Sequence, residues 1–414
     1  MKIVRLPALL LLASSVALSS AACGGKQTPD GQSRRAQAAA EAEMTPEERQ
    51  AAHEQRVEQT AEEALQEYIS AGTARERDYR QIDKRLKDVL KERPNDGDVM
   101  FNLGLLRYEQ NDRAGAEEWW QKATESSPTY ARGLANLGML QLVDGNVDAA
   151  EALFQQCVER SQTEPGCNIN LALISRNRNI NNGRLTRAEA QPSIDHLRFA
   201  LGGEARNATA YADLARIYHE MGQLPLARLV CENAILLGID EAPLHNRLGL
   251  VALAEDDVIV AYKEFQRAAE LDPDYQDAWM NIGAMALSFR DYEMAHHAFG
   301  KVLENEEALS DAVLVDAILS MGVAHRGLDD LAAAEKEYKR VLELQPGDVR
   351  ALYNLGVLYQ EAHRDYKAAV RWFEEFDRAA GQKSEALVAD VKQRITTLNA
   401  LIELLDEPDG SEDS

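Results

Sequence analysis

The sequence predicts an all-α protein in which about eight helical hairpins stack into a superhelical solenoid, with N-terminal helices before the stack and a capping helix after it. Three observations support this fold class. A small residue follows a large apolar residue at a nearly constant interval, and a second set of small and aromatic residues recurs in the same phase. The composition, 45% hydrophobic and 28% charged but only 6% aromatic, is typical of a folded helical protein.

The small residues of the first set mark a repeat. They are Gly104, Gly138, Ala172, Ala215, Gly249, Gly283, Gly322 and Gly356. Five of the seven successive intervals are identical, and the other two exceed this common interval by nine and by five residues. A fixed interval of about 20–50 residues indicates one supersecondary unit repeated along the chain. A single hairpin cannot bury its apolar face alone, so we expect each unit to be stabilised by its neighbours.

The second set lies in phase with the first. Residues 242–273 show this most clearly, with Gly249 in the first helix and Phe265 in the second. Small residues in facing helices let the backbones approach, and a large residue one turn onward fills the gap between neighbouring hairpins. In the last repeat the equivalent residues are Ala369 and Phe373, which implies a one-residue insertion before Ala369.

This pattern resembles the tetratricopeptide repeat, a helical hairpin whose period of about 34 residues matches the common interval. The resemblance covers residues 97–383. We expect the repeats at 97–130, 131–164, 165–207, 208–241, 242–275, 276–314, 315–348 and 349–383. The nine extra residues of the third repeat are expected between its helices, within 175–191, and the five extra residues near 304–314.

Helices are also expected on both sides of the array. Residues 45–96 are predicted to form N-terminal helices, the first beginning at Thr45, because Thr-Pro-Glu-Glu is typical of a helix N-terminus. Within them, residues 63–96 are a candidate degenerate repeat. Residues 384–405 are predicted to form a helix that covers the end of the array, and residues 406–414 form an acidic tail.

Residues 1–22 have the layout of a secretory signal, with a basic start, an apolar run and small residues at the end. The run is too short to span a bilayer comfortably. Small residues before Cys23 resemble the lipobox of bacterial lipoproteins, which implies a signal peptide over 1–22 and a lipid on Cys23. Ser20 stands where that family usually has Leu. Ordinary signal cleavage near Ala22 is the alternative.

The same resemblance implies a location. Gly24, rather than Asp, follows the cysteine, which favours a lipid-anchored protein of the outer membrane that faces the periplasm. Residues 23–44 are predicted to be a flexible linker because they are rich in Gly, Gln, Ala and Ser. The formal net charge of −24 makes the chain a poor general binder of nucleic acid or anionic lipid. Attachment to a membrane would therefore depend on the lipid.

The candidate binding residues form two rows on the first helices, which line the inside of the superhelix in tetratricopeptide proteins. Two positions before the small residue, asparagine recurs at Asn102, Asn136, Asn170, Asn281 and Asn354. One position after it, the row is mostly apolar and begins with Leu105, Met139 and Leu173. In peptide-binding members of the family such an asparagine row contacts the peptide backbone, since each amide offers a donor and an acceptor. Alternatively, the asparagines satisfy only local groups.

Both rows have exceptions. Asp213 and Arg247 take the asparagine position in the fourth and fifth repeats, and Arg216 takes the apolar position in the fourth. The peptide-contacting row is therefore expected to be interrupted there.

Two further features involve the third repeat. Its expected insertion holds four arginines in a stretch without acids: Arg176, Arg178, Arg184 and Arg187. They are either a docking site for an anionic partner, or solvated, or paired with the chain's own acids. Cys157 and Cys167 are ten residues apart and can be bridged if the protein is exported. The alternative is that Cys157 is a small core residue.

The sequence has no phosphate-binding glycine loop, no zinc spacing and no nucleophile elbow. We therefore expect no catalytic residues, no metal, no cofactor and no small-molecule substrate. The combination of lipobox and repeats resembles outer-membrane tetratricopeptide lipoproteins of trans-envelope machines, such as pilus-secretin pilotins and gliding-motility complexes. It implies a non-catalytic scaffold that binds other envelope proteins in a surface-motility machine (gliding or type IV pilus). Alternatives are assembly of outer-membrane proteins, regulation of cell-wall synthesis, or an enzyme with appended repeats.

Overall fold

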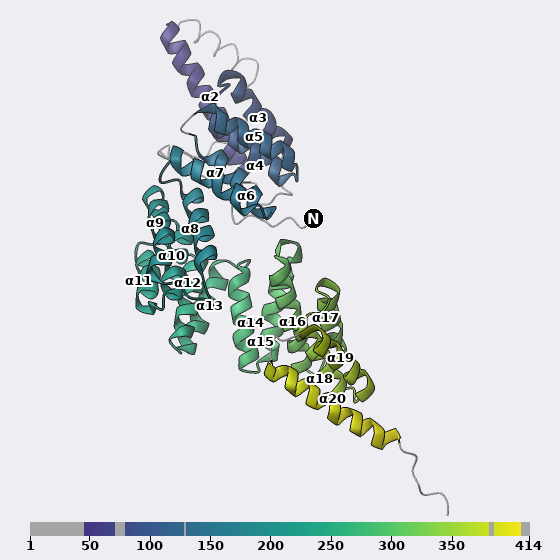
Figure 1. Cartoon of the computed structure of the whole chain (residues 1–414). Coiled ribbons are helices and arrows are strands. Elements are labelled where there is room, and N and C mark those ends of the chain that lie inside the picture. The colour runs from purple at the N-terminus through teal and green to yellow at the C-terminus, as the bar shows by residue number, and fades with distance from the viewer. Residues whose placement is uncertain (1–44, 71–78, 128–129, 381–384, 407–414) are drawn as a thin grey trace, which may run out of the picture. The chain divides into compact units, whose positions relative to one another are not determined.

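The computed structural model describes residues 45–70, 79–127, 130–380 and 385–406 (Figure 1). Nineteen α-helices and one 3₁₀ helix make up the regular structure of these residues, apart from one isolated bridge between Asn181 and Arg184. The all-α prediction is confirmed. The chain divides into two compact units, here called the N-terminal unit, up to Ala205, and the C-terminal unit, from Arg206. Each unit is considered by itself.

The described part of the N-terminal unit is a series of eight α-helices. They are α2 (Pro46–Ser70), α3 (Tyr79–Glu92), α4 (Gly97–Glu109), α5 (Arg113–Ser126), α6 (Arg132–Val143), α7 (Val147–Arg160), α8 (Pro165–Asn179) and α9 (Arg187–Gly203). Extensive contacts pair α4 with α5, α6 with α7 and α8 with α9. These three hairpins stack through contacts of α5 with α6 and of α7 with α8. They are the first three predicted repeats.

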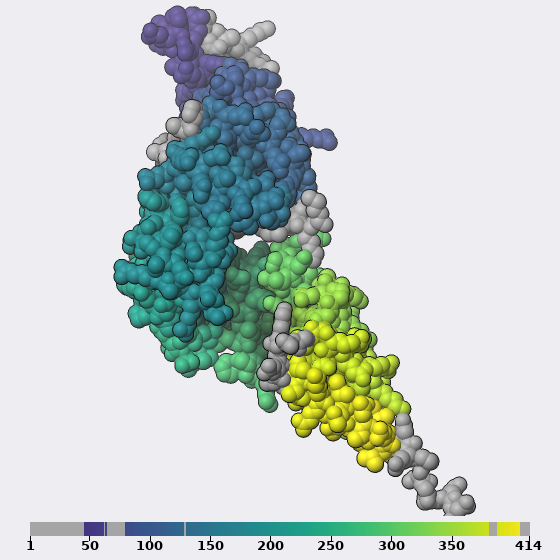
Figure 2. Space-filling view, in the orientation of Figure 1, coloured from purple at the N-terminus to yellow at the C-terminus, as the bar shows by residue number. Residues whose placement is uncertain are grey.

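The C-terminal unit continues in the same way. Its elements are α10 (Ala208–Glu220), α11 (Leu224–Leu236), α12 (Ala242–Ala254), α13 (Val258–Leu271), α14 (Gln276–Ser288), α15 (Tyr292–Leu303), η1 (Glu306–Ala308), α16 (Asp311–Gly327), α17 (Leu331–Leu344), α18 (Val349–Glu361), α19 (Tyr366–Ala380) and α20 (Glu385–Asp406). Successive pairs from α10 to α19 form five hairpins. The helix α20 lies against α19 (Figure 2, yellow).

The glycines of the repeat let the two helices of a hairpin come together around an aromatic ring. A Cβ atom added at Gly138 or at Gly249 would lie 2.5 Å from the ring of Phe154 or Phe265, respectively. Both rings are fully buried. Only glycine leaves room for the ring at these positions, which gives the packing reason for the repeat pattern. The glycine-to-ring interval is the same in these two repeats and one position longer in the last, as the insertion before Ala369 predicts.

The turn inside most hairpins follows one local design. A residue with positive φ, such as Asn111 (61°) or Arg290 (60°), comes directly before the N-cap of the second helix. That N-cap is often aspartate, as in Asp112 and Asp291, whose carboxylates accept hydrogen bonds from the backbone N–H three residues later. The positive φ reverses the chain, and the aspartate satisfies an amide that the helix itself leaves unpaired.

The extra residues of the third repeat are placed differently from the prediction, whereas those of the sixth lie within the predicted residues 304–314. In the third repeat they lengthen both helices to 15 and 17 residues and leave only residues 180–186 between them. The expectation that all nine lie in a connection is therefore wrong. Leu185 anchors the short connection in the core, and Thr186 caps α9 together with Glu189. In the sixth repeat the excess forms η1 and an early start of α16 at Asp311.

The flanking helices pack as expected. Thr45 and Glu48 form the reciprocal hydrogen bonds of a capping box at the start of α2. Ile82 of α3 belongs to a buried cluster with residues of α4, and Val391 of α20 to one with Phe373. The predicted signal peptide, Cys23, the predicted linker and residues 407–414 lie outside the described residues. No helix in the described ranges has the length and apolar character needed to cross a membrane.

A buried histidine of the C-terminal unit lies in an ionic network with two more exposed carboxylates. The imidazole of His245, on α12, lies between the carboxylates of Asp240 and Glu264, at 2.6 and 2.7 Å. Burial by itself lowers the pKa of His245, but the hydrogen bonds from the imidazole to the two carboxylates outweigh it, so the net shift is upward. The folded state therefore favours the charged imidazolium.

Candidate functional site

The first helices of the hairpins contact one another within each unit. In the N-terminal unit α6 contacts α8, and in the C-terminal unit α10 contacts α12, α12 contacts α14, and α14 contacts α16. The exposed side of these helices in either unit is called the first-helix surface below. The two rows predicted from the sequence belong to these helices, so their members lie at equivalent places on successive hairpins.

In the N-terminal unit the asparagine row has one unsatisfied member. Asn136 is only 8% exposed, and its Nδ2 is buried with no hydrogen-bond acceptor among the residues that the structure describes. Asn102 is partly buried, and Asn170 donates from Nδ2 to the backbone carbonyl of Gly166 at 2.7 Å. A buried donor without an acceptor costs about 1–3 kcal/mol. Because Nδ2 of Asn136 is itself buried, a partner's carbonyl reaches it only if neighbouring side chains move.

In the C-terminal unit the remaining asparagines of the row have local acceptors. Asn281 donates from Nδ2 to Oδ1 of Asn246 at 2.8 Å, and Asn354 donates to the carbonyl of Arg350 at 2.9 Å. The amide donors of Asn170, Asn281 and Asn354 thus bond to groups of the protein itself, as in the alternative that the asparagines satisfy only local groups.

The apolar row is divided between surface and core. Leu105 is 2% exposed and belongs to a core cluster with Phe101 and Leu140, which leaves almost no area for a partner. Met139 and Leu173 are partly buried and present some of their surface. Of the three predicted contacts, only Met139 and Leu173 are accessible.

Two arginines on the first-helix surface of the C-terminal unit were not assigned as site residues from the sequence. Arg216 of α10 donates from Nη2 to Oδ1 of Asp213 at 2.5 Å. The Nε atoms of Arg216 and of Arg247, on α12, are buried and have no acceptor in the described part of the chain. Burial, and next the nearby charge of Arg216, lower the pKa of Arg247. Their places in the two rows were the only sequence signal that could have indicated them.

The four arginines of the third repeat do not lie in one loop. Arg176 and Arg178 belong to the last turn of α8, and Arg178 pairs with Asp148 and Glu151 of α7 at 2.8 and 2.6 Å. For Arg178 the alternative of pairing with the chain's own acids applies. Arg184 and Arg187 are exposed. Docking of an anionic partner stays a prediction for Arg176, Arg184 and Arg187.

The two cysteines of the third-repeat region are joined. A disulfide links Cys157 of α7 to Cys167 of α8, and their Cα atoms are 6.3 Å apart. It connects two successive hairpins of the N-terminal unit. Cys231, in the C-terminal unit, is a buried free thiol whose pKa burial raises to about 12.

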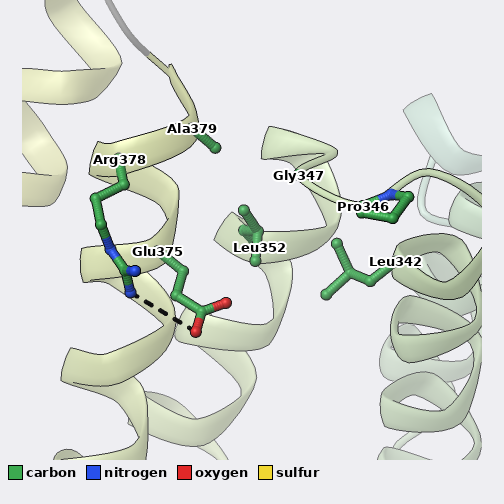
Figure 3. Close-up of a pocket in the computed structure, with 7 residues that line it drawn as sticks. All are labelled: Leu342, Pro346, Gly347, Leu352, Glu375, Arg378 and Ala379. Carbon is green, nitrogen blue, oxygen red and sulfur yellow. Dashed lines mark ion pairs between the residues drawn. The ribbon is translucent and has the colours of Figure 1, made fainter.

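A hollow of about 430 Å³ opens between the end of α17 and helices α18 and α19 (Figure 3). It is lined by Leu342, Pro346, Gly347, Leu352, Glu375, Arg378 and Ala379. Among the described residues its charged lining groups are the carboxylate of Glu375 and the guanidinium of Arg378, which pair at 3.7 Å. The described residues also contain no group of three or more potential metal ligands.

The family model described as the tetratricopeptide repeat matches residues 74–131, 101–165 and 319–384. The first match includes α3, the second helix of the candidate degenerate repeat. The matches and the geometry of the hairpins together support a tetratricopeptide-repeat protein.

Curated relatives match about two thirds of the chain. The chain is 25% identical over 288 residues to cellulose synthase operon protein C of Xanthomonas axonopodis pv. citri (strain 306), covering 66% of the chain and 18% of that protein. It is 23% identical over 273 residues to protein O-mannosyl-transferase TMTC3 of Homo sapiens, covering 65% of the chain and 28% of that protein. The chain thus spans less than a third of the length of either relative.

Similar solved structures cover about half of the chain. One is the structure titled functional characterization of pilF, from Pseudomonas aeruginosa, with a TM-score of 0.40 and 16% identity, covering 56% of this chain and 96% of that one. Another is MamA from Desulfovibrio magneticus RS-1, with a TM-score of 0.38 and 18% identity, covering 43% of this chain and 97% of that one.

Proposed function

We propose that this protein is a non-catalytic scaffold that holds segments of other proteins on its first-helix surface. The observation that carries the proposal is the row of amides Asn102, Asn136 and Asn170, which lie at equivalent places on successive first helices of the N-terminal unit. An asparagine amide offers a donor and an acceptor, so such a row can pair with the main chain of an extended segment whatever the side chains of the segment are. The accessible parts of Met139 and Leu173 add apolar contact on the same surface.

We further propose that the protein is exported and held at the outer membrane by a lipid on Cys23, facing the periplasm. The signal-like residues 1–22 and the small residues before Cys23 support this location. The Cys157–Cys167 disulfide supports an oxidising compartment. In that setting the bound segments belong to other envelope proteins, and a surface-motility machine is the favoured assembly. Assembly of outer-membrane proteins and regulation of cell-wall synthesis are the alternatives.

The binding proposal is tested with a double variant. Asn136→Ala with Asn170→Ala removes two amides of the row, and we expect the amounts of co-purified envelope proteins to fall several-fold. Asn233→Ala is the matched control, because Asn233 is an exposed asparagine on the second helix α11. Thermal unfolding of both variants checks that the hairpins stay folded. Unchanged capture by the double variant would count against the amide row.

The location is tested by metabolic labelling with a palmitate analogue. We expect label on the wild type and none on Cys23→Ser. Wild-type protein without label would end the lipoprotein proposal. A turnover by the purified protein with any envelope substrate would likewise contradict the non-catalytic reading.

A further inference from the structure

We propose that the first-helix surface of the C-terminal unit binds an acidic side chain of the partner segment through Arg216 and Arg247. The proposal rests on the proposed function and names the chemistry of one part of the bound segment. It concerns three neighbouring first helices, α10, α12 and α14, which contact one another in series.

The polar side chains around the two arginines already bond to one another. Asn246 of α12 is 3% exposed and accepts a hydrogen bond from Asn281 of α14. The hydroxyl of Tyr275, at the start of α14, also interacts with Asn246, and burial raises its pKa, so it stays neutral. These groups hold the surface in place and leave the arginine side chains as its unsatisfied part.

The charges at this place do not balance within the described residues. Arg216 has one carboxylate partner, Asp213, whereas Arg247 forms no ion pair or hydrogen bond with any described residue. The Nε–H groups of both arginines are buried and have no acceptor among the described residues, whereas each arginine as a whole is partly exposed. His219 of α10 adds no charge at neutral pH, because burial and the charge of Arg247 lower its pKa. Two guanidinium groups therefore share one carboxylate.

A carboxylate is the group that fits this imbalance. A guanidinium presents its donors as a planar fork that matches the two oxygens of a carboxylate, and such charge-assisted bonds are about twice as strong as neutral ones. A buried charged donor without an acceptor is the costliest kind of unsatisfied group. A second carboxylate, brought by the partner, satisfies Arg247 and relieves its repulsion with Arg216.

The negative charge of the whole chain does not prevent this contact. The net charge is −24, but charges farther apart than the Debye length of about 8 Å at physiological salt are largely screened. Once a segment lies on the surface, the two nearby arginines favour an acidic side chain over a neutral one. The overall charge instead slows the approach of acidic segments and makes their binding faster at higher salt.

The experiment uses the full-length protein and a phage-displayed library of random dodecapeptides as the probe. Selected peptides are synthesised with amidated C-termini, and each Asp or Glu is replaced in turn by Asn or Gln. We expect one acidic side chain to account for about a tenfold to hundredfold gain in affinity. The amidated terminus separates a side-chain carboxylate from a C-terminal one: binding that requires a free terminus would overturn the proposal as stated.

Three variants complete the test. Arg247→Gln should lower the affinity for the acidic peptide by the same tenfold to hundredfold and leave the affinity for its neutral analogue unchanged, as in a double-mutant cycle. Arg247→Lys keeps the charge without the fork and should lose only part of it. Lys263→Gln is the control for charge alone, since Lys263 lies on the second helix α13, and should change nothing. Thermal unfolding checks that each variant is folded.

The outcomes separate the two proposals. Peptides that bind the wild type equally well in acidic and neutral form overturn the carboxylate site and leave the scaffold function standing. Equal weakening of both peptides by Arg247→Gln also overturns it, since the arginine then acts only on the fold. A library without any enriched peptide contradicts the scaffold function and the carboxylate site together.

Discussion

Replacing Gly249 by alanine sets two opposing effects against each other. Alanine favours a helix interior by about 1 kcal/mol over glycine. The new Cβ atom, however, would lie 2.5 Å from the ring of Phe265, which is fully buried between two helices. Overpacking of this kind typically costs about 1–3 kcal/mol. We therefore expect Gly249→Ala to destabilise its hairpin by about 1 kcal/mol net.

Gly300→Ala is the matched control. Gly300 is also inside a helix, α15, but the nearest atom to a Cβ there is Cε of Met321 at 3.9 Å, an ordinary contact. It should gain the helix preference of about 1 kcal/mol without the clash. Because repeat arrays open locally, the assay is native-state hydrogen exchange of α12 and α13 for the first variant and of α15 for the second. Equal stabilisation by both substitutions would refute the packing explanation of the repeat.

Three more outcomes are expected. Reduction of the Cys157–Cys167 disulfide should lower the stability of the N-terminal unit by about 2–3 kcal/mol, seen as a lower denaturation midpoint with dithiothreitol that the double serine variant does not show. The pKa of His245 is raised on folding. The protonated imidazole therefore contributes fully to the free energy of unfolding below the unfolded pKa of about 6.5, and this stabilisation is lost as the pH rises through the folded pKa. The melting temperature of the wild type should therefore fall more between pH 6 and pH 8 than that of His245→Asn, and parallel curves would contradict this. Arg290→Gly should raise the melting temperature through a gain of about 0.5–1 kcal/mol, because Arg290 has a φ of 60°, and an unchanged or lower value would contradict the turn argument.

The hairpins could be predicted from the sequence because their packing is local and periodic. The spacing of Gly138 and Phe154 predicts a small and a large residue that pack between helices. The structure adds that the ring lies over the glycine of its own hairpin, and it has this contact in both units. The extra residue before Ala369 could be found for the same reason, since it shifts the ring of Phe373 relative to Gly356 by one place. A constant repeat interval in the sequence therefore predicts the same contact in each hairpin that keeps the interval.

Features that depend on neighbouring hairpins were not predictable in this way. Nothing in the period states that Asn281 donates to Asn246, or that Arg247 is left without a partner among the described residues, because these depend on the side chains across a hairpin boundary. The extra residues of the third repeat were placed in a connection because the period gives only their number. Their division between α8 and α9 depends on the anchoring of Leu185 in the core.

The central claim is that partner segments lie on the first-helix surface, and site-specific photo-crosslinking in native envelopes tests it most directly. A photoreactive residue is placed at Met139, partly buried on the first helix α6, or at Gln155, exposed on the second helix α7 of the same hairpin. We predict defined adducts with other envelope proteins from position 139 and none from position 155. Adducts from position 155 alone, or equally from both, would contradict the account.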